Sequence, residues 1–181
     1  MDIQELPAIE GQAGCEYKIS LIHLRTRMKY SEIHPTATSR QVADVLERAI
    51  ARLPPFYLVM TDNAWCFTMA YTAHPERQSA FERRVQQLGL RHGRIPPRSP
   101  WRNGFIERSH RTDNAECFHR ERFTSSEQRR YRHRLWELHY NTARPHQGVH
   151  GLHRSCCVLI YCSRTAKSYG RNIGRLKPST E

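Results

Sequence analysis

The stretch from Ser39 to Asn63 constrains the fold more than any other part of the sequence. Its first half carries apolar residues at the spacing of one helix face, and Pro54 and Pro55 end that pattern. The stripe comprises Val42, Val45, Leu46, Ala49, Ile50 and Leu53. An uninterrupted apolar run at 56–60 follows and stops at the turn formers 61–63. A strand buried on both faces has this pattern, and a strand after an amphipathic helix is usually parallel to an earlier one. The sequence therefore predicts an α/β layer fold.

The flanking segments extend this prediction to a mixed central sheet flanked by helices. Residues 16–24 and 27–35 are rich in aromatic and β-branched side chains, as in a hairpin of antiparallel strands. Short strands are also predicted at 1–7 and 90–95. Helical spacing predicts further helices at 77–89, 103–118 and 125–141, with Tyr131, Leu135 and Leu138 on one side of the last.

The charge balance indicates a phosphate-rich partner. The chain has 29 Lys and Arg against 17 Asp and Glu, a formal charge of +12 and a pI near 9.9, and most of the cations are arginine. Guanidinium groups grip phosphate through two parallel hydrogen bonds, so nucleic acid is the expected partner. A merely soluble basic protein is the alternative. No apolar stretch is long enough to span a membrane and the start lacks a secretory pattern, so we expect a cytoplasmic protein.

The cysteines are interpreted as reduced thiols, because a cytoplasmic protein rarely keeps disulfides. They are Cys15, Cys66, Cys117, Cys156, Cys157 and Cys162. The last three lie near His150 and His153, but they lack the matched ligand pairs of a structural zinc site.

The chain divides into a predicted domain at 1–151 and a tail at 152–181. The tail has no sustained periodicity, little acid and a Gly-, Ser- and Arg/Lys-rich end, which predicts a mostly disordered basic segment. No internal repeat is present.

Three acidic residues are candidates for metal chemistry on phosphodiesters, which needs oxygen ligands for divalent cations. Asp2 lies on the first predicted strand, Asp62 follows the buried strand, and Glu107 lies on the helix after the proline-rich turn. If the first and fourth strands are neighbours, a crossing helix can bring Glu107 to both aspartates. Taken alone, an Asp-Asn pair after a strand, as at Asp62, is most often a turn former, and Glu107 alone could be a first-turn helix acid favoured by the helix dipole.

Three separated blocks carry a resemblance to a known family. They are "VMTDNAWCF", "LGLRHGRIPPRSPWRNGFIERSHRTDNAECF" and "YNTARPHQGVHGL". In this order they strongly resemble the catalytic core of DDE transposases of bacterial insertion sequences, within the retroviral integrase superfamily. The resemblance covers roughly 2–151 and implies a ribonuclease-H-like fold, in agreement with the predicted order of strands and helices.

The resemblance also implies an activity and its ligands. Asp2, Asp62 and Glu107 match the family's catalytic and metal-binding acids, which share two Mg²⁺ ions, with Mn²⁺ as a possible substitute. Water would first free a 3′-hydroxyl at the transposon end, and that hydroxyl would then attack target DNA. The implied partner is double-stranded DNA, from both transposon ends and target. Because two ends are joined, a homo-oligomer is expected, and the bacterial protein would be nucleoid-associated when bound.

The same blocks supply candidate DNA contacts. They are Arg102, Asn103, Arg108, His110, Arg111, Arg144 and His146. The Asn103–Gly104 pair is expected to allow a tight turn into the helix that carries Glu107. A solvated basic face is the alternative interpretation of the arginines.

Two departures from the family favour a truncated copy. The first aspartate is residue 2, whereas relatives have several strand residues before it, and losing three removes about 10 Å of strand pairing at ~3.3 Å per residue. By this comparison the chain is expected to lack the upstream helix-turn-helix of relatives, and the stretch "HRSCCVLIYCSR" differs from their ending. A catalytically inactive remnant that binds DNA through its arginines, or inhibits a full-length transposase, is therefore the alternative. A generic ribonuclease-H-like nuclease fits the acids but not the "RNGFIERSHRT" block.

Overall fold

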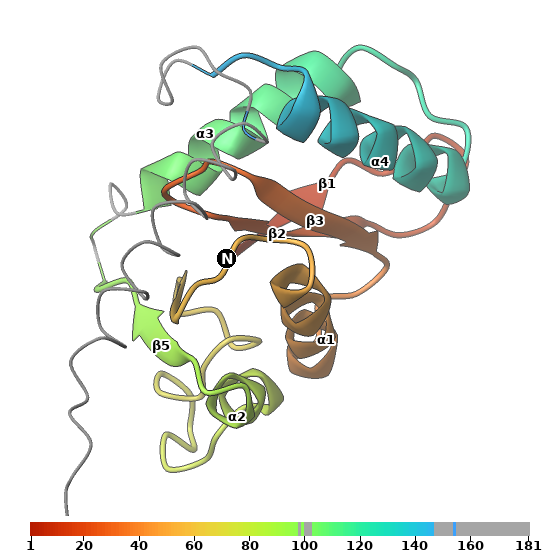
Figure 1. Cartoon of the computed structure of the whole chain (residues 1–181). Coiled ribbons are helices and arrows are strands. Elements are labelled where there is room, and N and C mark those ends of the chain that lie inside the picture. The colour runs from red at the N-terminus through yellow and green to blue at the C-terminus, as the bar shows by residue number, and fades with distance from the viewer. Residues whose placement is uncertain (98, 100–102, 147–153, 155–181) are drawn as a thin grey trace, which may run out of the picture.

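The computed structural model describes residues 1–97, 99, 103–146 and 154. The predicted tail at 152–181 therefore lies outside the described residues, except for Arg154. Helices α1 and α2 lie on one side of the strands, and α3 and α4 lie on the other (Figure 1). The elements are β1 (Asp2–Leu6), β2 (Glu16–Ile22), β3 (Lys29–His34), α1 (Ser39–Ile50), β4 (Leu58–Thr61), α2 (Ala80–Gln87), β5 (Arg91–Arg94), α3 (Gly104–Asp113), the π-helical turn η2 (Asn114–Phe118) and α4 (Ser126–Thr142). This order confirms the predicted α/β layer fold.

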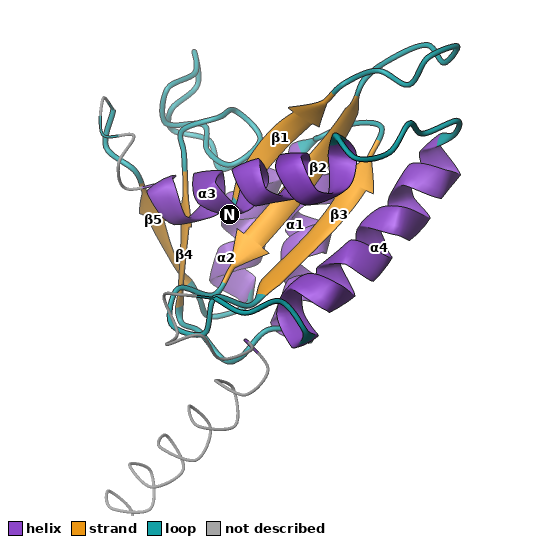
Figure 2. Cartoon of the chain, turned by 90° about the horizontal axis from the view of Figure 1, so that it is seen from above, coloured by secondary structure: helices purple, strands orange, loops and turns teal. Residues whose placement is uncertain are grey.

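The strands form two hydrogen-bonded parts. One is antiparallel, with the order β1-β2-β3, and contains the predicted hairpin; the other is the parallel pair β4-β5. The parts adjoin at the start of β1, where the amino group of Met1 donates a hydrogen bond to the carbonyl oxygen of Met60 at 2.6 Å. Figure 2 shows β4 and β5 beside β1. The beginning of β1 and the end of β4 are therefore neighbours, as the active-site hypothesis requires.

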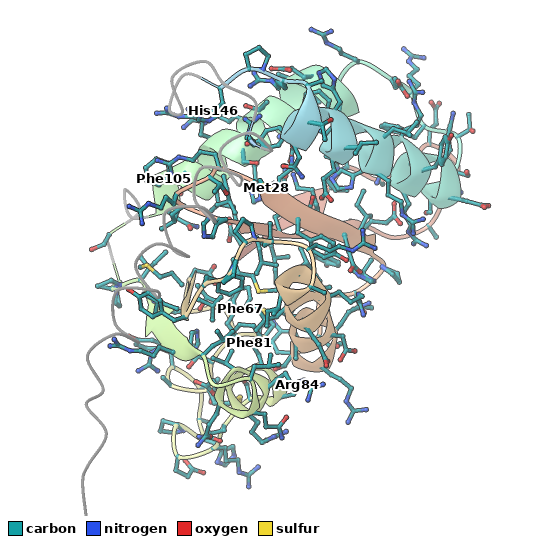
Figure 3. All side chains as sticks on the ribbon, in the orientation of Figure 1. Met28, Phe67, Phe81, Arg84, Phe105 and His146 are labelled. Atoms are coloured by element: carbon teal, nitrogen blue, oxygen red, sulfur yellow. The ribbon has the colours of Figure 1, made fainter. Side chains whose placement is uncertain are left out.

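The sheet face toward α1 is apolar. Successive strand residues point to opposite faces, so Ile3, Ile19 and Leu21 pack against the buried stripe of α1. Phe67 and Phe81 complete this core beside α1 and α2, with ring centroids 5.2 Å apart in an edge-to-face arrangement (Figure 3). The periodic apolar pattern that predicted α1 is the pattern that buries it.

The opposite sheet face is also buried but combines polar groups with a small apolar cluster, which contains Leu6, Ile33, Cys117 and Phe118. Lys18 on β2 and Lys29 on β3 both pair with Asp113 at the end of α3, and all three side chains are fully buried. The distance from the Lys18 Nζ to the Asp113 Oδ2 is 2.6 Å, and the Trp136 indole donates to the Asp113 Oδ1 at 2.9 Å. This ion group connects β2, β3, α3 and α4.

Helix α4 presents its predicted apolar side to solvent. Tyr131, Leu135 and Leu138 are 60%, 43% and 61% exposed. Its packed side instead carries Arg129 and His133, which contact Glu16 and Ser31 on the sheet. The helix therefore packs polar side chains, together with Trp136 and Tyr140, on the sheet, and its predicted apolar stripe lies outside.

The glycines that follow α2 and begin α3 have different backbone conformations. Gly89 follows α2 with φ +68°, the left-handed conformation of a helix stop. Gly104 has no positive φ and starts α3, after Asn103 at φ −96°. The expected dependence of this turn on glycine is therefore wrong, since the chain enters α3 through ordinary backbone conformations.

The described cysteines are free thiols at Cys15, Cys66 and Cys117, as predicted. The remaining cysteines, and the histidines 150 and 153 weighed with them as zinc ligands, lie outside the described residues. Within the described ranges, no helix is long and apolar enough to cross a membrane.

Candidate active site

The alternation of β1 directs Asp2 toward α3. Asp2, Gln4 and Leu6 occupy one face of this strand, while Ile3 packs in the opposite core. The Gln4 Nε2 donates to the Asn114 Oδ1 at 2.9 Å, and the Asp2 Oδ2 lies 3.7 Å from the Nδ1 of His110. Helix α3 therefore lies along the strand that carries Asp2.

Asp62 directly follows β4, at the edge where that strand ends. Its Oδ1 accepts a hydrogen bond from the backbone N–H of Ala64 at 3.1 Å. The next residue, Asn63, donates through its Nδ2 to the carbonyl oxygen of Ile95 at 2.9 Å, which ties the turn to the end of β5. Asp62 therefore forms the turn and also lies at the sheet edge. Its role in the turn does not exclude a role in metal binding.

Glu107 lies in the first turn of α3 and is exposed. It is separated by three and seven residues from His110 and Asn114, the two residues of this segment that face β1, so it lies on their side of the helix. The side of α3 that packs on β1 therefore also carries Glu107 toward the junction of β1 and β4.

The electrostatics of Asp2 link the candidate acids. Burial raises the pKa of Asp2 to about 6, the negative charge of Asp62 adds to the rise, and that of Glu107 adds a smaller part. The amino group of Met1 acts in the opposite direction. The pKa of the Cys66 thiol is likewise raised to about 11, by burial and by the charges of Asp62 and Asp2. The three carboxylates predicted from the sequence therefore share one electrostatic environment.

The three carboxylates provide the oxygen ligands that a divalent cation prefers, but they are not arranged around a common metal position. Hard cations such as Mg²⁺ prefer carboxylate oxygens, and a cation would stabilise the ionised form of Asp2, whose pKa is raised by burial and, to a smaller extent, by repulsion from Asp62 and Glu107. Among the residues that the structure describes, no group of three or more His, Cys, Asp or Glu side chains is arranged to hold a metal ion. The acids converge on one region without forming a closed cage.

His110 is a neighbour of Asp2 rather than a surface residue. It is 9% exposed, and burial together with the positive charge of Lys18 lowers its pKa to about 3. It is therefore uncharged at neutral pH, and its contact with Asp2 is not an ion pair. The expected contact of His110 with DNA disagrees with this burial, because α3 turns this side chain inward onto the sheet.

The other predicted DNA contacts are divided between two places. Arg111 is exposed on α3, whereas Arg144 and His146 line a cavity on another side of that helix. Arg108 is exposed and also lines this cavity. Asn103 precedes α3 without a side-chain capping bond and lines an apolar cavity of about 360 Å³. Arg102 lies outside the described residues.

Sequence reasoning missed the residues that hold α3 in place. Gln4 and Asn114 join β1 to η2. Two spacings could have found this contact: the strand alternation from Asp2 to Gln4, and the helical spacing from Glu107 through His110 to Asn114.

The comparisons with known proteins agree with the fold described above. The family model described as "Integrase core domain" matches residues 88–152, which include β5, α3 and α4. The catalytic core domain of BIV integrase is similar over 93% of this chain and 97% of that one, with a TM-score of 0.59 and 20% identity. The fold is that of an integrase catalytic core. It is an α/β fold of the ribonuclease-H-like class.

A second similar structure is a chain of the simian T-cell lymphotropic virus intasome, solved in complex with the PP2A regulatory subunit B56 gamma. The TM-score is 0.63 at 16% identity, over 80% of this chain. The similar region spans only 48% of that chain, about half its length. The comparison with curated proteins gives no match.

Proposed function

We propose that the chain is a DDE-type transposase of a bacterial insertion sequence, which cleaves phosphodiester bonds at transposon ends and transfers the freed 3′ ends to target DNA. Asp2, Asp62 and Glu107 are its catalytic and metal-binding residues. The observation that carries this proposal is that the start of β1 adjoins both the end of β4, through the Met1–Met60 hydrogen bond of 2.6 Å, and α3, through His110 at 3.7 Å from the Asp2 carboxylate. The charges of Asp62 and Glu107, which add to the burial that raises the pKa of Asp2, agree with it. The integrase core match at 88–152 supports the same chemistry.

Divalent ions, when bound, supply an activated oxygen nucleophile and neutralise charge on the scissile phosphate. The role of the chain is to hold the ligands on separate rigid elements: Asp2 on β1, Asp62 at the end of β4 and Glu107 on α3. Because a carboxyl must lose its proton to bind a cation, the pKa of about 6 at Asp2 makes cation affinity fall below pH 6. Exposed Arg108 and Arg111 flank Glu107 and can contact the DNA backbone.

A nicking assay tests this proposal. The chain is incubated with labelled transposon-end DNA and Mg²⁺ or Mn²⁺, and Glu107→Gln is compared with Glu127→Gln, which removes an exposed first-turn acid from α4. Loss of a metal ligand is expected to slow nicking by roughly 100-fold or more, whereas the control keeps its rate. Equal nicking by wild type and Glu107→Gln would remove Glu107 from its role.

A second candidate function is DNA binding without catalysis. It is favoured by the absence, in the described ranges, of a group of acids arranged to hold a metal ion. Neutralising about six phosphates should give a log-log slope of affinity against salt near −5. Such a slope without any nicking in Mg²⁺ or Mn²⁺ would support the binding function, and a flat salt response would contradict it.

The proposal includes a homo-oligomer, because strand transfer joins two DNA ends. The exposed stripe of Tyr131, Leu135 and Leu138 on α4 offers an apolar surface of the kind that contacts between copies bury. Leu138→Glu is expected to lower the oligomeric state in sedimentation experiments. Leu24→Glu, at a leucine that is 52% exposed on the β2–β3 turn, is the matched control.

A further inference from the structure

A second side of α3 lines a cavity that is separate from the carboxylates. Phe105, Arg108, Ser109 and Thr112 recur at helical spacing on this side, about 150° around the helix from Glu107. The cavity measures about 530 Å³ and is closed by residues of the β2–β3 hairpin and the end of α4. Phe105 and His146, which both line it, lie on the same side of the molecule next to α3 (Figure 3).

The cavity is strongly basic. Its lining includes Arg27, Arg108, Arg144 and Arg154, and the described lining contains no acidic side chain. The guanidinium group of Arg144 donates hydrogen bonds of 2.8 and 2.6 Å to the carboxylate of Glu116, which neutralises its charge. For the other arginines of the lining, no ion pair with a carboxylate occurs within the described part of the chain. The positive charge is therefore concentrated without an internal counter-charge.

Buried donors around this cavity lack acceptors. Arg154 is 0% exposed, and its guanidinium group stacks on the ring of Tyr140 at 3.6 Å. Its Nη1 donates to the carbonyl oxygens of Tyr140 and Arg144, but within the described residues its Nε and Nη2 have no hydrogen-bond partner. The same holds, over those residues, for the Nη1 of Arg27 and the hydroxyl of Ser109. Burying charged donors without partners is costly, so these groups indicate a ligand with several acceptor oxygens.

We propose that this cavity binds a phosphate-type oxyanion, held by Arg27, Arg108, Arg154 and the Ser109 hydroxyl. Two of these arginine planes are held in place, because Arg27 stacks on Phe105 at 3.7 Å and Arg154 on Tyr140. Preorganised guanidinium groups suit the paired oxygens of a phosphate. Free diphosphate and a DNA backbone phosphate share this chemistry. With DNA as the source the site rests on the proposed function; with a free anion it does not.

Diphosphate binding to the full chain, measured by calorimetry without divalent metal, tests the site. We expect wild-type protein to bind and Arg27→Gln to bind about ten-fold more weakly or worse, because a charged hydrogen bond is lost. Arg25→Gln removes the same charge from an exposed position of the same turn and should stay within about two-fold of wild type. No binding by wild type, or equal weakening by both variants, would overturn the site.

A charge-neutral pair of variants guards against a folding defect in Arg27→Gln. Ser109→Ala removes the hydroxyl that faces the cavity, and Ser20→Ala removes an equally buried hydroxyl on β2 that also lacks a partner among the described residues. Only Ser109→Ala should weaken diphosphate binding, by roughly three- to ten-fold. Equal affinities for the two variants would contradict the assignment of Ser109.

Competition distinguishes the two sources of phosphate. Duplex DNA affinity is measured with saturating diphosphate and with NaCl at matched ionic strength. Weaker DNA binding in diphosphate, absent in Arg27→Gln, assigns the cavity to a backbone phosphate; unchanged DNA binding assigns it to a free anion. A chain that binds diphosphate but never nicks DNA would refute the proposed catalysis and leave this site standing.

Discussion

The two faces of the β1-β2-β3 sheet are buried to a similar degree by opposite kinds of side chain. Toward α1 the strands present Ile19 and Leu21, whereas toward α3 and α4 the same strands present Lys18 and Lys29, paired with Asp113. Apolar packing has no preferred direction, but hydrogen bonds and ion pairs do. The apolar face therefore supplies stability, and the polar face also fixes how α3, the helix of Glu107, lies on the sheet.

The largest expected effect comes from breaking the polar face at its centre. Asp113→Asn removes the counter-charge of Lys18 and Lys29 and should cost about 5 kcal/mol of unfolding free energy, since two buried ammonium groups lose their partner. The loss should shrink from pH 7 to pH 10, because the pKa of Lys18 is already lowered to about 8 by burial and falls further without Asp113.

Chemical denaturation across this pH range measures the effect. Asp44→Asn, the same change at an exposed position of α1, is the matched control and should shift stability by less than about 0.5 kcal/mol. A constant loss for Asp113→Asn at all pH values would mean that the ion group does not carry the stability of this face.

A substitution in the apolar face should lower stability by an amount that does not depend on pH. Phe81→Ala deletes a ring that is fully buried and packs edge-to-face on Phe67 and on His92, with centroids 5.2 and 5.3 Å apart. The lost transfer energy and the cavity left behind should cost about 4 kcal/mol. Because no charge changes, the difference from wild type should stay constant from pH 7 to pH 10 in the same denaturation experiment. If the loss of unfolding free energy of Phe81→Ala varied with pH as that of Asp113→Asn does, the two faces would not differ in the way proposed.

The same contrast explains what could be predicted from the sequence. The spacing of Val42, Val45 and Leu46 predicted α1 correctly, because the apolar periodicity of a helix depends only on residues that are close together in the sequence. The burial of Lys18 could not be predicted, since its partner Asp113 lies 95 residues away and the residues around Lys18 contain no signal of it. For the same reason α4 was located but the outward direction of its apolar stripe was not.

The residues of the candidate site could be predicted where a local sequence pattern marks them. The position of Asp62 follows from the end of an apolar strand, and Glu107 was found from a sequence block. The burial of His110 against Asp2 depends on the rotation of α3 about its axis, which the polar face sets through Asp113 and through the bond between Gln4 and Asn114. That rotation also creates the basic cavity with Arg154, which no local pattern indicates.

A smaller effect on stability is expected from a substitution of Asp2, which lies where the face toward α3 reaches the other candidate acids. Asp2 has a pKa raised from 3.8 to about 6, so the folded state holds its proton more tightly than the unfolded state. The stability from this difference is complete below pH 3.8 and is lost as the pH rises through 6. Relative to wild type, Asp2→Asn should therefore gain about 2–3 kcal/mol between pH 3.5 and pH 7.

Urea denaturation at these two pH values, without divalent metal, measures the gain. Added Mg²⁺ should stabilise the wild type at pH 7 and not Asp2→Asn, because a bound cation favours the ionised carboxyl. Glu5→Gln, on the same strand but exposed, is the control and should show neither effect. Identical pH profiles for Asp2→Asn and wild type would separate Asp2 from the other carboxylates.

The smallest effect is expected from an ion pair of the apolar side that lies outside its core. Arg84 on α2 pairs with Glu47 on α1, and their side chains are 36% and 49% exposed (Figure 3). Water screens this pair and each side chain loses rotamer freedom to form it, so Arg84→Gln should cost at most about 0.5 kcal/mol and less in high salt. A double-mutant cycle with Glu47→Gln measures the coupling directly. A coupling above about 2 kcal/mol would show that exposed charges contribute as Lys18 and Asp113 do, and burial would no longer account for the difference between the two sides of the sheet.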